Sequence, residues 1–116
     1  MKIEGVVIKG QQLGRKLGFP TANIDAENIR IDNGVYASTV CIGGRVYRAM
    51  SNIGIRPSVD GKRRLLETYI FEFDGDLYGQ LLTVELGQKI RDEHKFASIE
   101  ELKERLHIDA EHIRNM

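Results

Sequence analysis

The chain has 116 residues, of which 41% are hydrophobic and 29% charged, and 17 Lys and Arg side chains balance 17 Asp and Glu. This length builds one ordinary domain, and zero net charge disfavours both a disordered chain and a generally basic, polyanion-binding surface. The apolar runs are too short to span a bilayer, and the N-terminus lacks a signal-peptide core. We therefore expect a cytoplasmic domain with no nucleic-acid and no membrane partner.

Short runs rich in β-branched and aromatic residues, bounded by glycines, predict at least five strands. These runs are 3–9, 34–42, 45–53, 65–73 and 79–86. Gly43-Gly44 supplies a two-residue hairpin turn, and Asp74-Gly75-Asp76 is expected to join the fourth and fifth runs in the same way. Tight turns between successive strands favour an antiparallel sheet, and closure into a small barrel would remove the exposed edges.

The hydrophobic period changes to that of a helix only near the C-terminus. The apolar residues that share one helical face are Ile99, Leu102 and Leu106. Ser98 and Glu101 match a capping box at the helix start. Asp109 either caps a second short helix or lies where the first helix continues.

These elements predict a single all-β-dominated domain over residues 1–116. We expect strands over roughly 3–86, a loop over 87–97 and a helical tail over 98–116. The architecture is a small closed antiparallel barrel with a C-terminal helix.

The long stretch 10–33 is where we expect function, because a loop of this length in a small domain is usually functional. Its glycines recur every fourth residue among cationic side chains, namely Gly10, Gly14 and Gly18 with Lys9, Arg15 and Lys16. Backbone N–H groups beside positive charge suit phosphate oxygens. A glycine-bearing surface loop without a ligand is the alternative, since neither a Walker A loop nor a dinucleotide fingerprint is present.

Thr21 and Asn23 are two residues apart, so their side chains point the same way if the segment is extended. A hydroxyl and an amide oxygen are hard ligands, which suit a Mg²⁺ ion otherwise held by phosphates and water. Plain turn chemistry is the alternative interpretation.

Glu67 interrupts an apolar strand face. By alternation its neighbours on that face are Leu65, Tyr69, Phe71 and Phe73. Partial burial there should raise the pKa of Glu67 toward the range useful to a general base. The opposite face is also half apolar, so the pattern leaves the orientation open, and a glutamate paired with Lys or Arg at the barrel mouth is the alternative.

Two further groups of residues follow strands. Asn52 and Gly54 lie where the third run ends and by themselves indicate an ordinary turn with glycine at positive φ. Arg91, Glu93 and Phe96 lie between the last strand and the helix. By pattern alone the two charged residues form a solvated cluster, and the ring packs at the helix start.

Several motifs occur in a characteristic order along the chain. They are 14–23 (GRKLGFPTAN), 34–37 (GVYA), 52–57 (NIGIRP), Glu67, 78–79 (YG) and 90–96 (IRDEHKF). In this order they resemble the riboflavin kinase (flavokinase) family, including the kinase module of bacterial bifunctional FAD synthetases. The resemblance implies a six-stranded closed antiparallel Greek-key barrel with a C-terminal helix.

The resemblance also implies an activity, the transfer of the ATP γ-phosphoryl group to the terminal ribityl hydroxyl of riboflavin. The products are FMN and ADP, and Mg²⁺ or another divalent cation accompanies ATP. It implies Glu67 as the base and Thr21 and Asn23 as ligands of the metal and the phosphates. The other implied nucleotide-side residues are Gly10, Gly14, Arg15, Gly18, Asn52 and Gly54. The implied flavin-side residues are Arg91, Glu93 and Phe96.

Other functions remain open. A non-catalytic barrel that binds flavin or a nucleotide explains the glycines but not Glu67 on an apolar face. An oligonucleotide-binding barrel is disfavoured by the 7% aromatic content and zero net charge. Since the match begins near Met1, the chain is expected to be either a monofunctional kinase or the kinase half of a bifunctional FAD synthetase. In the second case a preceding adenylyltransferase domain would be its partner.

Overall fold

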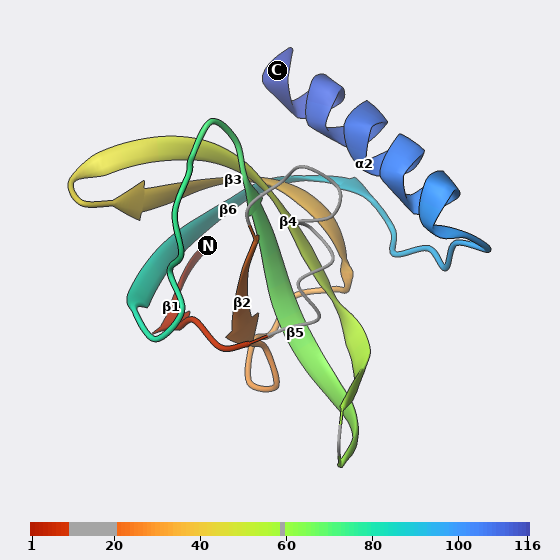
Figure 1. Cartoon of the computed structure of the whole chain (residues 1–116), viewed down its shortest axis with the longest axis horizontal. Helices are drawn as coiled ribbons and strands as arrows, with labels where there is room; N and C mark the ends of the chain where they lie inside the picture. Colours follow the sequence, from red (N-terminus) through yellow and green to blue (C-terminus); the bar gives the residue numbers. More distant parts are fainter. Residues whose placement is uncertain (10–20, 59) are drawn as a thin grey trace.

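The computed structural model describes residues 1–9, 21–58 and 60–116, in which six antiparallel strands precede one C-terminal helix (Figure 1). The elements are β1 (Lys2–Val6), β2 (Thr21–Asp25), β3 (Gly34–Ile42), β4 (Arg45–Ser58), β5 (Gly61–Ile70), β6 (Leu81–Arg91) and α2 (Ile99–Arg114). The strand order is β1-β6-β3-β4-β5-β2. A bridge between Ile8 and Asn23 brings the two ends of the sheet together, so the barrel is nearly closed. The expected fold class is confirmed.

The connection from β5 to β6 differs from the expected hairpin. The prediction of a tight turn at Asp74-Gly75-Asp76 is wrong, because β5 pairs with β4 and β2 whereas β6 pairs with β3 and β1. Strand β5 ends at Ile70, and Glu72 adopts a φ of 56°. The chain then crosses to the far side of β3, which produces the Greek-key order of β6, β3, β4 and β5.

The predicted strand bounds are most accurate where a tight turn between neighbouring residues ends the strand. Strand β3 has the expected bounds, and Gly43 and Gly44 form the hairpin with φ values of 58° and 80°. Two strands run further than expected, β4 to Ser58 and β6 to Arg91. Because β6 reaches Arg91, the loop expected over 87–97 is shorter. Strand β2 lies within the stretch 10–33, which we had expected to be a loop.

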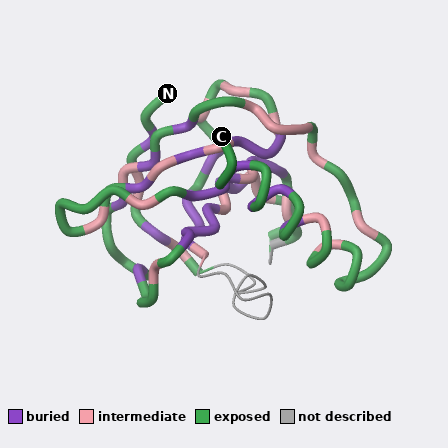
Figure 2. Tube along the Cα trace, turned by 90° about the horizontal axis from the view of Figure 1, so that it is seen from above, coloured by how far each residue is buried: buried purple, intermediate pink, exposed green. Residues whose placement is uncertain are grey.

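The two faces of the sheet bury different hydrophobic clusters. The buried residues along the chain are purple in Figure 2. Inside the barrel the fully buried side chains include Ala22, Ala49, Ile53, Leu66 and Val84. On the outer face, a second cluster joins strands β3, β4 and β5 to the helix through Val35, Met50, Tyr69, Leu106 and Ile113. The outer face of these strands is therefore partly covered by α2.

A single helix follows the barrel, so the alternative of two helices is wrong. The backbone N–H of Glu101 donates to Ser98 Oγ at 3.2 Å, which confirms the predicted cap. Asp109 lies inside α2, where its buried carboxylate pairs with Arg91 of β6 and with Arg105. No helix within the described part of the chain is long and apolar enough to cross a bilayer.

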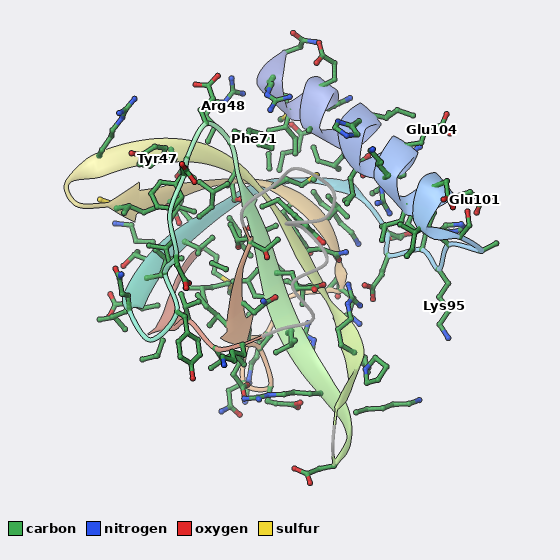
Figure 3. All side chains as sticks on the ribbon, in the orientation of Figure 1. Tyr47, Arg48, Phe71, Lys95, Glu101 and Glu104 are labelled. Atoms are coloured by element: carbon green, nitrogen blue, oxygen red, sulfur yellow. The ribbon has the colours of Figure 1, made fainter. Side chains whose placement is uncertain are left out.

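The C-terminal end of α2 is held by the barrel as well. Arg48 of β4 donates to the backbone carbonyls of Ile113 and Arg114, and the guanidinium of Arg114 lies 4.5 Å from the centre of the Phe71 ring (Figure 3). A cation at the last carbonyls of a helix is favourable, because these groups carry partial negative charge. The C-terminal half of the helix is thus fixed against one side of the sheet.

Candidate active site

Three polar residues stand side by side on adjacent strands, and we call them the polar row. Asn23 of β2 pairs directly with Glu67 of β5, and Glu67 pairs in turn with Asn52 of β4. Directly opposite residues of antiparallel strands project to the same face with Cβ atoms about 5 Å apart. Their chain neighbours Ala22, Leu66 and Ile53 point into the barrel core, so the polar row lies on the outer face.

Two members of the polar row have an amide oxygen without a partner. Asn23 is only 5% exposed, and within the described residues neither its Oδ1 atom nor that of Asn52 accepts a hydrogen bond although both atoms are buried. A buried acceptor left unpaired costs about 1–3 kcal/mol. Such a cost is expected where the acceptor is kept for a ligand.

Thr21 lies beside the polar row. Thr21 and Asn23 both lie in the extended strand β2, which is the condition for their side chains to point the same way. Thr21 pairs with Tyr69 of β5, and Asn23 pairs with Glu67. The side chain of Thr21 is half-buried. The hydroxyl of Thr21 and the carboxamide of Asn23 therefore project on the same side of β2.

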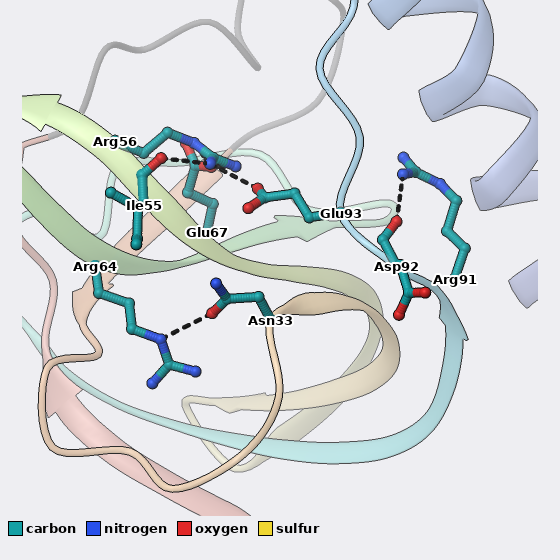
Figure 4. A network of polar contacts seen from close by, with 8 residues as sticks. All are labelled: Asn33, Ile55, Arg56, Arg64, Glu67, Arg91, Asp92 and Glu93. Atoms are coloured by element: carbon teal, nitrogen blue, oxygen red, sulfur yellow. Dashed lines mark hydrogen bonds and ion pairs between the residues drawn. The ribbon is translucent and has the colours of Figure 1, made fainter.

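Glu67 belongs to an ion-pair network (Figure 4). Arg56 of β4 lies between two carboxylates, with Nη2 at 2.8 Å from Glu67 Oε1 and Nη1 at 2.6 Å from Glu93 Oε1. The cationic partner that we considered for Glu67 is thus Arg56. The cluster keeps one net negative charge when all three groups are ionised, which favours a cation close to the polar row.

The charge states of this network follow from its burial. Burial raises the pKa of Glu67 above the ordinary value for glutamate, and Glu93 adds to this effect, while the Arg56 guanidinium opposes it. Burial would by itself lower the pKa of Arg56, but Glu67 and Glu93 raise it above its usual value. Arg56 therefore stays charged, whereas Glu67 is easier to protonate than a solvated glutamate.

Gly54 lies within β4, so its predicted place in a turn is wrong, and its φ is not positive. A Cβ atom at this position would overlap both carboxylate oxygens of Glu93. The missing side chain lets Glu93 lie against the strand and reach Arg56. Glu93 is partly buried and paired, so the alternative of a solvated charge cluster is wrong.

A cavity of about 520 Å³ opens beside the polar row, between β4 and the segment that leads to α2. Its lining includes Asn52, Arg56, Glu93, Phe96, Ile99 and Leu102. This volume is within the range of small-molecule sites, and the lining combines apolar side chains with a few polar groups. The expected flavin-side residues Glu93 and Phe96 both line it.

Arg91, the third expected flavin-side residue, is engaged with the helix. Its Nε donates to Asp109 Oδ2 at 2.8 Å, and its guanidinium lies 5.6 Å from the centre of the Phe96 ring. Arg91, Glu93 and Phe96 together line a neighbouring cavity of about 400 Å³. The alternative of solvated charge is therefore wrong for Arg91 too, since it pairs with a buried carboxylate.

The expected apolar face around Glu67 is correct for three of its four neighbours, since Leu65 is buried two residues before Glu67 on the same side of β5. Tyr69 and Phe71 belong to the outer cluster, but Phe73 packs against the barrel core because β5 ends at Ile70. The phosphate-loop residues Gly10, Gly14, Arg15 and Gly18 lie outside the described residues, so their role stays a prediction.

Sequence reasoning missed Arg56 as a member of the site. The residue was part of a quoted motif, but only the register between β4 and β5 and the path of the 92–98 segment bring both carboxylates to it. Within the described ranges no three His, Cys, Asp or Glu side chains gather into a metal site.

Comparison with known families identifies the class of this barrel. The family model for flavokinase, described as riboflavin kinase, matches residues 1–116. The chain belongs to the riboflavin kinase family, as its motifs predicted.

Known relatives agree with this family. The RNA-binding riboflavin kinase RibR of Bacillus subtilis is 41% identical over 108 residues, covering 92% of this chain and 47% of that protein. The bifunctional riboflavin kinase/FMN adenylyltransferase of Pseudomonas fluorescens is 45% identical over 111 residues, covering 93% of this chain and 35% of that protein. The chain thus spans between a third and a half of the length of these curated relatives.

A solved structure supports the fold. The crystal structure of riboflavin kinase from Trypanosoma brucei matches with a TM-score of 0.65 and 25% identity, covering 99% of this chain and 78% of that one. The six-stranded barrel with its C-terminal helix is therefore an arrangement that this family shares.

Proposed function

We propose that this chain phosphorylates riboflavin, transferring the γ-phosphoryl group of ATP to the terminal ribityl hydroxyl. The observation that carries the proposal is the polar row beside a cavity of small-molecule size. In this row Glu67 stands between two buried amide oxygens that accept no hydrogen bond from a described residue. Phosphoryl transfer requires mainly the positioning of the reactants and the neutralisation of charge. The polar row and the cavity offer groups for both.

In the proposed reaction Glu67 is the base. The bond between the ribityl oxygen and the γ-phosphorus forms while the bond to the β–γ bridging oxygen breaks. ADP leaves with that electron pair, and Glu67 accepts the proton of the hydroxyl. The burial that raises the pKa of Glu67 makes it a better proton acceptor than a solvated carboxylate.

Thr21 and Asn23 are the proposed ligands of the Mg²⁺ ion and the phosphates. The fit rests on the buried Oδ1 atom of Asn23, which accepts no hydrogen bond within the described residues, and on the hydroxyl of Thr21 on the same side of β2. Hard oxygen atoms of this kind suit Mg²⁺, which keeps its other positions for phosphates and water. When bound, the metal supplies neutralisation of the negative charge on the transferred phosphoryl group.

The flavin ring is assigned to the cavity lined by Glu93 and Phe96, and Arg91 borders the adjoining cavity. An aromatic ring and a polar side chain there provide a stacking surface and a hydrogen-bonding group for a planar heterocycle. The ATP phosphates are assigned to the other side of Glu67, toward Thr21. Gly10, Gly14, Arg15 and Gly18 keep the phosphate-binding role that the sequence predicts for them.

The proposal is tested by incubating the purified chain with riboflavin, ATP and MgCl₂ and separating the flavins by chromatography. We expect FMN and ADP in equal amounts, and no FMN when EDTA removes the metal. Riboflavin binding without any FMN would instead identify a non-catalytic flavin-binding barrel. The proposal concerns the kinase step alone, so no FAD is expected.

A further inference from the structure

Asn52 is a polar residue whose role the reaction above leaves open. Its Oδ1 atom is buried and accepts no hydrogen bond from any described residue, although Asn52 lies in the middle of a fully paired strand. The register provides no partner for this atom, because its cross-strand neighbours are Val35, which is apolar, and Glu67, which is an acceptor when ionised.

The position of Asn52 is defined from two sides. It is the direct cross-strand neighbour of Glu67, so its Cβ lies about 5 Å from that of the proposed base. It also lines the cavity that contains Glu93, Phe96 and Leu102. A ligand that extends from the cavity toward Glu67 therefore comes close to Asn52.

Charge decides which part of a ligand fits this place. Glu67 and Glu93 both lie close to this part of the cavity, and Arg56 is the cation that pairs with them. An anionic polyphosphate beside two carboxylates would be repelled, whereas a neutral polyol would not. A buried amide oxygen next to this cluster suits a hydroxyl donor.

We infer that Asn52 binds a hydroxyl group of the ribityl chain and so guides the terminal hydroxyl to Glu67. The inference rests on the proposed function, because it assumes that the flavin ring occupies the cavity. It moves Asn52 from the nucleotide side, where the motif resemblance places it, to the flavin side. Asn52 then acts as a specificity-determining residue that distinguishes a flavin with a polyol chain from one without.

The test compares riboflavin with lumiflavin, which has the same ring system and a methyl group in place of the ribityl chain. Dissociation constants for both flavins are measured by fluorescence anisotropy with the wild-type chain and with Asn52→Ala. We expect riboflavin binding to weaken roughly 3- to 10-fold, the effect of one lost neutral hydrogen bond, while lumiflavin binding stays the same. In steady-state assays the KM for riboflavin should rise and the KM for ATP should not.

Two variants control this comparison. Asn28→Ala removes an exposed amide from the loop after β2 and should change neither flavin's affinity. Asn52→Ser replaces the carboxamide with a smaller hydroxyl group. It serves if Asn52→Ala does not fold, which thermal unfolding reports. We expect Asn52→Ser to weaken riboflavin more than lumiflavin as well.

Several results would overturn the inference. Equal weakening of both flavins would show that Asn52 acts on the ring or on the fold, and a raised KM for ATP with an unchanged KM for riboflavin would return it to the nucleotide side. Failure of the proposed function can be told apart from failure of this inference. If the wild-type chain forms no FMN but Asn52→Ala still weakens riboflavin binding and not lumiflavin binding, the proposed kinase activity is wrong and the ribityl contact stands.

Discussion

Polar residues on the inner face of β3, β4 and β5 differ in their hydrogen bonding from those on the outer face. On the inner face, Ser51 Oγ lies 2.8 Å from Ser38 Oγ and 2.9 Å from Thr68 Oγ1, and all three side chains are buried. The next residue along each of two strands, Asn52 and Glu67, belongs to the polar row outside. One step along β4 thus separates Ser51, whose hydroxyl is paired, from Asn52, whose Oδ1 atom accepts no hydrogen bond from a described residue.

This difference between the two faces shows which polar groups lower the stability of the barrel. The hydroxyls of Ser38 and Thr68 both bond to that of Ser51, so these three buried groups cost little stability because each has a partner. The amide oxygens of Asn23 and Asn52 have none within the described residues, and Glu67 is a carboxylate with a pKa raised by burial. Groups kept in an unfavourable state are typical of a functional site.

The sharpest way to break this comparison is Glu67→Gln. The amide keeps the size of the side chain but cannot accept the proton, so turnover should fall by roughly 10²- to 10⁴-fold. The midpoint of thermal unfolding should change little, because Arg56 keeps its ion pair with Glu93. FMN formation under saturating substrates measures the first quantity, and near-normal turnover would remove Glu67 from the role of base.

The inner face should show the reverse behaviour in Ser51→Ala. The methyl group leaves the buried hydroxyls of Ser38 and Thr68 without their common partner, which should lower the free energy of unfolding by about 1–3 kcal/mol. Turnover of the folded protein should stay close to wild type. Urea unfolding measures the stability, and a large loss of turnover at full stability would contradict the assignment of these hydroxyls to the fold.

Arg56→Met tests how the positive charge next to Glu67 affects the pH dependence of the reaction. The proposed base must be deprotonated, so kcat/KM should fall at low pH as Glu67 becomes protonated. Because the pKa of Glu67 is raised, this fall should begin at a higher pH than for an ordinary glutamate. Arg56 lowers the pKa of Glu67, so its removal should move the acid limb to higher pH. Arg63→Met removes the same charge from an exposed pair with Asp25 and should leave the limb in place. A limb that moves to lower pH in Arg56→Met would contradict the account.

Gly54→Ala is expected to have the smallest effect. The new methyl group overlaps the carboxylate of Glu93, a flexible side chain that can swing away, so the barrel should fold but lose the ion pair with Arg56. Riboflavin affinity should fall about fivefold, corresponding to about 1 kcal/mol. In a double-mutant cycle, Gly54→Ala should add nothing to Glu93→Ala, and additive effects would separate Gly54 from Glu93.

Sequence was sufficient for features that depend on neighbouring residues. Gly43-Gly44 predicted its hairpin, Ser98 and Glu101 predicted the helix start, and the spacing of Thr21 and Asn23 gave two side chains on one face. The family itself followed from the order of the motifs.

Features that depend on distant segments could not be predicted in this way. Asp74-Gly75-Asp76 has hairpin chemistry, yet the pairing of β6 with β3 sends the chain elsewhere. Gly54 and Pro57 normally interrupt a strand, but β4 continues through both because it pairs with β5 up to Ser58. The place of Arg56 between two carboxylates requires Glu93 to arrive from the far end of β6.

The most direct test of the account measures FMN formation per folded molecule and the free energy of unfolding in parallel for Glu67→Gln and Ser51→Ala. The account predicts a crossed result, in which Glu67→Gln keeps its stability and loses turnover while Ser51→Ala loses stability and keeps turnover. If both variants lost the two properties together, or if Glu67→Gln still formed FMN at the wild-type rate, the assignment of the outer face to catalysis and the inner face to the fold would be contradicted.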